Sequence, residues 1–136
     1  MLFDFDDADE ALSAIPVAAQ RALDHAGKRL APEAWSSLEV DDRRELVALG
    51  ATPLVNAAAV EAVLSRATPA PKAMMRVPDP GPSRPSATLV TALAALGFTL
   101  DEPTWRGLRP LERYALAHAA QRPERLLRVA GEILAP

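Results

Sequence analysis

The chain has 136 residues, a formal net charge of −3 and no cysteine, and 49% of its residues are hydrophobic although only 4% are aromatic. The lack of cysteine excludes disulfides, thiolate metal sites and cysteine nucleophiles. The negative charge argues against nucleic-acid binding, which normally requires a clustered basic face. Because much of the apolar content is alanine, the best helix former, composition predicts an all-α fold.

The amino-terminal residues do not have the pattern of a secretory signal. Residues 1–7 contain neither a basic region nor an apolar run, and phenylalanines at Phe3 and Phe5 alternate with aspartates. No apolar stretch in the chain approaches the roughly 20 residues that a membrane span requires. We therefore expect a cytoplasmic protein without membrane contact, and a short extended arm whose phenylalanines dock on the helices.

A set of residues recurs at a constant shift of 70 positions, and both tryptophans belong to it. We interpret this pattern as an old duplication of one helical module, and we expect the recurring residues to pack each module. The prediction is two tandem modules, 15–66 and 86–134, packed into a single all-α domain spanning 1–136. The recurring residues are Leu23, Gly27, Leu30, Trp35, Leu38, Arg43 and Leu46, followed by Leu93, Gly97, Leu100, Trp105, Leu108, Arg113 and Leu116.

The first half of each module predicts a helix and a short helical turn. The first helix ends at Gly27 or Gly97, where a left-handed residue commonly closes a helix. The short turn that follows begins at Pro32 in the first copy and at residues 101–103 in the second. We expect this turn to place the module's tryptophan in the core.

The second half of each module predicts two further helices. One begins near Glu39 or at Pro110, and the last begins at Pro53 or Pro123, because proline is favoured at the first helical position. The apolar stripes expected on the last helices are Val55, Ala58, Ala59, Ala62 and Val63, and then Leu126, Leu127, Ala130, Ile133 and Leu134.

Residues 67–85 separate the modules and hold six of the thirteen prolines. Such a composition predicts an extended linker, or a strap that lies across the surface. Met74 and Met75 lie within it and have two interpretations. They anchor the strap to the core, or they form an adaptable contact surface for a partner.

Arg43 and Arg113 lie in the first turn of their helices, where the helix dipole disfavours a cation. We therefore expect each to have a specific partner, either the face of the nearby tryptophan or a buried carboxylate. The favoured interpretation is that these arginines hold the module together.

The sequence offers no recognisable catalytic or metal-binding pattern. His25 and His118 occupy non-equivalent positions of the two copies and lack neighbours at ligand spacing. Gly81 and Gly107 stand alone rather than in a phosphate-binding loop. We therefore expect a protein that is not an enzyme, with no catalytic residues, no cofactor and no metal.

Arg122, Arg125 and Arg128 form the clearest positive stripe, which we expect on the exposed side of the last helix. Helices joined by short turns also permit a helix-turn-helix-like nucleic-acid-binding regulator, which stays open as an alternative. The same stripe is equally suited to an acidic protein. Together with Met74 and Met75, these arginines are the candidate partner contacts.

Two stretches resemble the nitrate reductase-associated proteins. The first comprises residues 3–6 together with Ile15-Pro16, Gly27-Lys28 and Trp35, and the second is the run from Trp105 to Leu116. The resemblance covers most of the chain but consists of packing residues, so it carries no active site. It implies a non-enzymatic accessory protein that binds a client, namely nitrate reductase or its molybdenum-cofactor maturation machinery.

Overall fold

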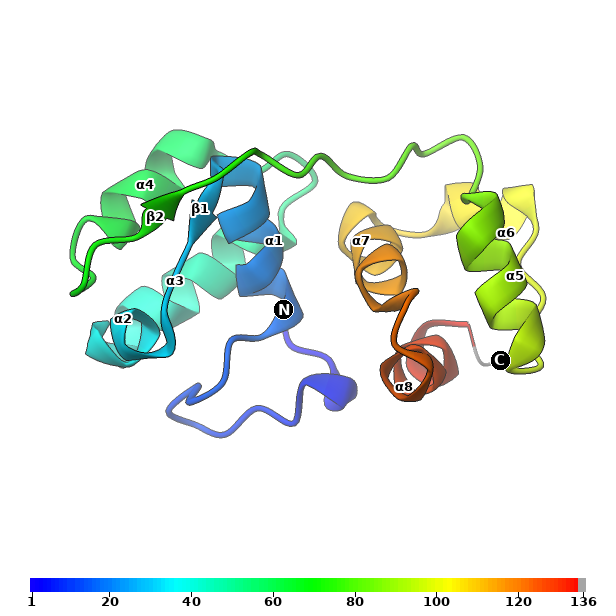
Figure 1. Ribbon diagram of the computed structural model, residues 1–136, viewed down its shortest axis with the longest axis horizontal. Helices are drawn as coiled ribbons and strands as arrows, with labels where there is room; N and C mark the ends of the chain where they lie inside the picture. Colours follow the sequence, from blue (N-terminus) through cyan, green and yellow to red (C-terminus); the bar gives the residue numbers. More distant parts are fainter. Residues whose placement is uncertain (135–136) are drawn as a thin grey trace. The chain divides into compact units, whose positions relative to one another are not determined.

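The computed structural model describes residues 1–134, and the chain divides into two compact units, Met1–Pro78 and Asp79–Pro136. Helices dominate both units, as Figure 1 shows, which confirms the predicted helical class. One correction is needed, because β1 (Lys28–Arg29) and β2 (Lys72–Ala73) form a two-stranded antiparallel sheet in the first unit. That the two modules pack together as one domain stays a prediction.

The first unit contains four α-helices after a short 3₁₀ turn. These elements are η1 (Asp4–Asp6), α1 (Val17–Ala26), α2 (Pro32–Ser37), α3 (Val40–Ala51) and α4 (Ala57–Leu64). The expected start of α2 at Pro32 is confirmed, and Glu39 is the N-cap of α3.

Residues 79–134 of the second unit contain four α-helices, and the second of them is the shortest, as in the first unit. They are α5 (Ala87–Ala95), α6 (Glu102–Gly107), α7 (Pro110–Ala119) and α8 (Pro123–Ile133). The predicted starts of α7 and α8 at proline are confirmed. Common origin of the two units by duplication stays a prediction. None of the helices in residues 1–134 combines the length and apolarity needed to cross a bilayer.

Helices α1 and α3 of the first unit approach each other very closely. Ala18, Ala19 and Ala22 of α1 are completely buried, and a Cβ atom added to Gly50 of α3 would lie 1.6 Å from the carbonyl oxygen of Ala18. Such a distance is far inside van der Waals contact, so only glycine permits this crossing. The contact between α1 and α3 is therefore built on small residues.

A buried arginine ends α3 and delays the start of α4. Arg21 of α1 is 0% exposed, and its guanidinium donates to the carbonyl oxygens of Gly50 at 2.8 Å, Pro53 at 3.0 Å and Thr52. A cation at the carboxyl end of a helix satisfies free carbonyl groups and complements the dipole. Because the Pro53 carbonyl is held by Arg21, the prediction that α4 begins there is wrong. It begins at Ala57, and the Asn56 side chain accepts a hydrogen bond from the Ala59 amide at 3.1 Å.

The late start of α4 also changes which of its residues face the core. Val60, Val63 and Leu64 are buried, whereas Ala58 and Ala62 of the predicted stripe are exposed. In α8 the predicted Leu126 and Ala130 are buried together with Val129. Leu127, which was predicted to be in the stripe, is 49% exposed. Both stripes were therefore correct in part: the α4 stripe is shifted by about one residue, whereas the α8 stripe keeps Leu126 and Ala130, gains Val129 and loses Leu127.

The amino-terminal arm docks through both of its phenylalanines, as expected. Phe3 and Phe5 are buried, and their rings stack with centroids 4.7 Å apart. The arm is not wholly extended, because Asp6 closes the turn η1 by accepting from the Phe3 amide at 3.0 Å. The other carboxylate oxygen of Asp6 accepts from the Val17 amide at 3.0 Å. Asp6 thus caps α1, whose N-cap residue Pro16 has no side-chain acceptor.

Both predicted left-handed glycines are confirmed. Gly27 has a φ of +66° and Gly97 a φ of +89°. At Gly27 a Cβ atom would also lie 2.8 Å from the carbonyl oxygen of Met74, so the glycine lets a later segment of the chain pass closely over the end of α1. At Gly97 the surrounding space is open, and only the backbone angle favours glycine.

Candidate functional site

The tryptophans attach each unit's leading segment to its short helix. Trp35 Nε1 donates to the Leu12 carbonyl oxygen at 2.7 Å, and Trp105 Nε1 donates to the Gly81 carbonyl oxygen at 2.8 Å. Both indoles are buried, as the sequence predicts. A buried indole N–H normally requires such an acceptor. The tryptophans are therefore packing residues with a defined polar contact.

Arg43 has the tryptophan partner that was expected, together with several carbonyl groups. Its guanidinium carbon lies 6.0 Å from the Trp35 ring centre, and its nitrogens donate to the carbonyl oxygens of Trp35 (3.2 Å), Ser36 (2.8 Å) and Ala11 (2.6 Å). The hydrogen-bond acceptors of Arg43 are thus backbone carbonyl oxygens, not the buried carboxylate that was the other expected partner. Arg43 thus joins the amino-terminal arm to the end of α2 and the start of α3.

Arg113 makes the related contacts in the second unit. It donates to the Trp105 carbonyl oxygen at 3.5 Å and to that of Leu108. The leucines of the recurring set are buried, except that Leu108 is half-buried. Because these side chains face the interior of each unit, a binding surface has to be sought elsewhere.

The Pro-rich segment is an ordered strap over the first unit in its first half. We define the strap as residues 67–77, and Figure 1 shows it passing from α4 through β2 and over α1. The Thr68 amide donates to Ser37 Oγ at 2.8 Å, the Met74 amide to the Gly27 carbonyl oxygen at 2.9 Å, and the Val77 amide to that of Asp24 at 3.0 Å. Backbone hydrogen bonds along its length hold the strap to the unit.

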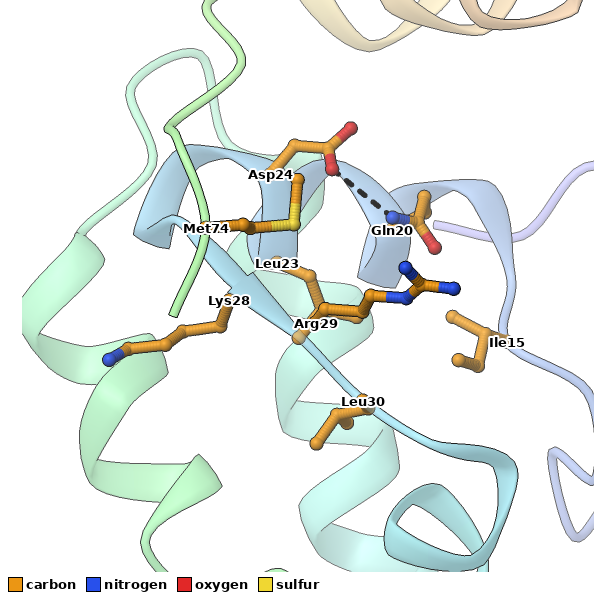
Figure 2. Close-up of a pocket in the computed structure, with 8 residues that line it drawn as sticks. All are labelled: Ile15, Gln20, Leu23, Asp24, Lys28, Arg29, Leu30 and Met74. Atoms are coloured by element: carbon orange, nitrogen blue, oxygen red, sulfur yellow. Dashed lines mark hydrogen bonds between the residues drawn. The ribbon is translucent and has the colours of Figure 1, made fainter. Parts of the chain in front are cut away.

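A surface pocket of about 410 Å³ lies beside the strap (Figure 2). Its apolar lining comes from Ile15, Leu23 and Leu30, and its polar lining includes Gln20 and Asp24 of α1. Gln20 Nε2 donates to Asp24 Oδ1 at 3.2 Å. Lys28, Arg29 and Met74 complete the lining, so the pocket combines an apolar floor with charged and methionine side chains at its edge.

Positive charge gathers on the small sheet next to this pocket. The register places Arg29 opposite Lys72 and Lys28 opposite Ala73. Figure 2 shows the Arg29 side chain extending along the pocket toward Gln20, while Lys28 points to the other side. These three cations were not among the residues predicted to form a site. The signal that could have found them is that Lys28 and Lys72 are the only lysines of the chain.

The candidate contacts Met74 and Met75 lie on the strap. Met74 is 41% exposed and lines the pocket, whereas Met75 is 87% exposed. The interpretation that these side chains anchor the strap to the core is therefore wrong for Met75, because the anchoring is done by backbone amides. Both methionines are open to contact by a partner.

The other candidate contacts lie on α8 and its N-cap. Arg122 and Arg128 are exposed, but Arg125 is half-buried, so the three arginines do not form the uniformly exposed stripe that was expected. Arg122 Nη2 donates to the His118 carbonyl oxygen at 3.3 Å, and the His118 ring stacks on Tyr114. Within residues 1–134 no group of three or more histidine, aspartate or glutamate side chains is arranged to hold a metal ion.

Carboxylates with a perturbed pKa lie in turns and helix starts. A side-chain hydrogen bond from Ser13 lowers the pKa of Asp9, and one from Thr104 lowers the pKa of Asp101. For Glu112, burial raises the pKa, but hydrogen bonds from Arg109 outweigh it, and the net pKa is lowered. Each of these acids stabilises local backbone structure rather than lining the pocket beside the strap.

A family model described as "Conserved nitrate reductase-associated protein" matches residues 2–125. Since the match spans most of the chain, the protein belongs to this family, in agreement with the resemblance seen in the sequence. No curated protein matches the chain, and no solved structure matches it.

Proposed function

We propose that this member of the nitrate reductase-associated family is a non-enzymatic accessory protein that binds a client protein. The family description names an association with nitrate reductase, and our proposal takes the reductase, or the machinery that loads its molybdenum cofactor, as the client. The observation that carries the proposal is the ordered strap of the first unit, which presents exposed apolar side chains at Met74, Met75 and Val77.

The exposed strap side chains are suited to protein binding on energetic grounds. Burying a methionine side chain contributes about 1.5–3 kcal/mol, and its flexible thioether adapts to irregular partner surfaces. Three backbone amides already fix the path of the strap, at Thr68, Met74 and Val77. A partner would therefore meet a preorganised backbone, which reduces the entropy lost on association.

The recurring residues support an accessory role over a catalytic one. Their polar members, the two tryptophans with Arg43 and Arg113, donate to backbone carbonyl oxygens within their own unit. Their function is then to hold two small helical units in shape. A client-binding protein needs this rigidity and an exposed contact surface, and it needs no reactive group.

Affinity capture tests the proposal. The tagged chain is used to capture proteins from nitrate-grown cells of its own source, and the eluate is examined by mass spectrometry with a Met75→Glu variant in parallel. We expect enrichment of nitrate reductase or a molybdenum-cofactor maturation protein with the parent chain, and loss of it with the variant. Recovery of neither class of protein would refute the proposal. Salt-sensitive retention on DNA in place of protein capture would favour the nucleic-acid-binding alternative.

A further inference from the structure

The two-stranded sheet concentrates positive charge on a chain whose net charge is −3. Arg29 and Lys72 are register partners in an antiparallel ladder. Directly opposed residues point to the same face of a sheet, with Cβ atoms about 4.5–5.5 Å apart, and like charges in that position are destabilising. The ladder therefore places two cations side by side at a cost to the fold.

No carboxylate of the described residues offsets the charge repulsion between Arg29 and Lys72. Within residues 1–134, the side chains of Arg29 and Lys72 take part in no hydrogen bond or ion pair. The neighbouring Lys28 reaches Glu61 only at 3.9 Å, on the other side of the strand. Asp24 is the acid that lines the adjacent pocket, but it is largely buried and accepts a hydrogen bond from Gln20. An anion from outside the chain would remove the repulsion.

Apolar side chains accompany these cations. Because strand residues alternate between faces, Met74 shares the face of Lys72, and Figure 2 shows Met74 above the pocket next to Asp24. Met75 follows with 87% of its surface exposed. Leu23 and Leu30 supply an apolar floor in the same pocket. The surface thus offers cationic and apolar contacts within a few residues of each other.

We infer that this ribbon surface, defined as Arg29, Lys72 and Met74 with the adjacent exposed Met75, docks an acidic segment of a partner protein that carries apolar side chains between its carboxylates. The inference rests on the proposed client-binding function and specifies its contact chemistry. A carboxylate of the segment lies between Arg29 and Lys72, and an adjacent apolar side chain packs on Met74 and the pocket floor. The methionines favour a protein over a nucleic acid, whose phosphates gain nothing from them.

Methionine methyl NMR of the intact chain tests the surface directly. The chain contains only Met1, Met74 and Met75, so ¹³C-methyl labelling gives two reporters on the ribbon surface and one elsewhere. The probe is a short synthetic peptide in which glutamate alternates with leucine, with a version carrying glutamine for glutamate as its control. We expect the acidic peptide to shift the Met74 and Met75 signals, and the neutral peptide to bind much more weakly.

Charge reversal at Arg29 and Lys72 provides a second test of the ribbon surface. We expect the double variant Arg29→Glu with Lys72→Glu to lose about tenfold or more in peptide affinity, since each exposed ion pair contributes up to about fivefold and reversal adds repulsion. Arg84→Glu is the matched control, because Arg84 is exposed and lies in the other unit. Unshifted Met74 and Met75 signals, equal binding of the neutral peptide, or equal loss in the control would each overturn the inference. So would preferential binding of single-stranded DNA at the same methyl groups.

Capture of nitrate reductase separates this inference from the proposed function. If the acidic peptide binds the ribbon surface but the parent chain captures no client, the proposed function fails and the docking chemistry stands. If the parent chain and the double variant capture the reductase equally well, the proposed function stands and the ribbon surface is overturned as the client site.

Discussion

Replacing Gly50 by alanine tests whether close approach of α1 and α3 holds the first unit together. The new Cβ atom would lie 1.6 Å from the Ala18 carbonyl oxygen and 2.5 Å from the Ala18 carbonyl carbon. Neither atom belongs to a flexible side chain, so the two helices themselves have to separate. The Gly50 carbonyl would move with α3, and its hydrogen bond from Arg21 at 2.8 Å would be strained.

The expected loss of stability follows from these contacts. Overpacking a well-packed core costs about 1–3 kcal/mol, and a strained hydrogen bond to a charged group costs about 1.5–3 kcal/mol. Alanine's higher helix propensity returns only about 1 kcal/mol. We therefore expect Gly50→Ala to lower the free energy of unfolding by about 1.5–5 kcal/mol, or to prevent folding of the first unit.

Urea denaturation followed by far-ultraviolet circular dichroism measures this loss. Gly131→Ala in α8 is the matched control, because nothing lies within 4 Å of its added Cβ. This control substitution should leave stability unchanged or raise it by up to about 1 kcal/mol. A Gly50→Ala chain as stable as the parent would show that the crossing of α1 and α3 is not as close as described.

Three further predictions concern side chains whose hydrogen bonds cap a helix or hold the amino-terminal arm. Arg43→Ala should lower the free energy of unfolding by about 1.5–3 kcal/mol, because the hydrogen bonds of Arg43 to carbonyl oxygens are lost. As a control, Arg44→Ala at the exposed neighbouring position should change the free energy of unfolding by less than about 0.5 kcal/mol. Equal effects of the two substitutions in thermal denaturation would contradict the role assigned to Arg43. Trp35→Phe removes the indole hydrogen bond to the amino-terminal arm, so proteolysis of the arm should become faster while the helix content measured by circular dichroism is kept. Hydrogen bonds from Thr104 lower the pKa of Asp101 below its ordinary 3.8, so its contribution to stability is fully present above that value and is lost as the pH falls through the lowered pKa. The free energy of unfolding of Asp101→Asn should therefore depend less on pH in this range than that of the parent chain. A variant with the same pH dependence as the parent would contradict the assigned cap.

Local signals in the sequence were enough to identify most of the helix boundaries. Gly27 and Gly97 need backbone angles that other residues avoid, and Pro110 and Pro123 suit the first turn of a helix. Each of these preferences acts within a few residues, so it is legible without knowledge of the fold. The spacing of the tryptophans likewise predicted their burial.

The candidate site was predicted only in part. Met74 and Met75 stood out because adjacent methionines are unusual in a Pro-rich segment, and the structure leaves both exposed. Arg29 and Lys72 did not stand out, because they are far apart in the chain and their strands contain two residues each. Strands of that length have no readable alternation of polar and apolar residues.

What the sequence by itself determined is the helical class, the left-handed glycines Gly27 and Gly97, the proline starts of α7 and α8, and most of the residues that pack each unit. What only the tertiary structure decided is where long-range contacts override a local preference. Pro53 is suited to begin a helix, yet Arg21 holds its carbonyl oxygen and α4 begins at Ala57. Gly50 looks like an ordinary helix residue until α1 is placed against it. In both cases the deciding atom lies about thirty residues away in the sequence, and a local pattern contains no information about it.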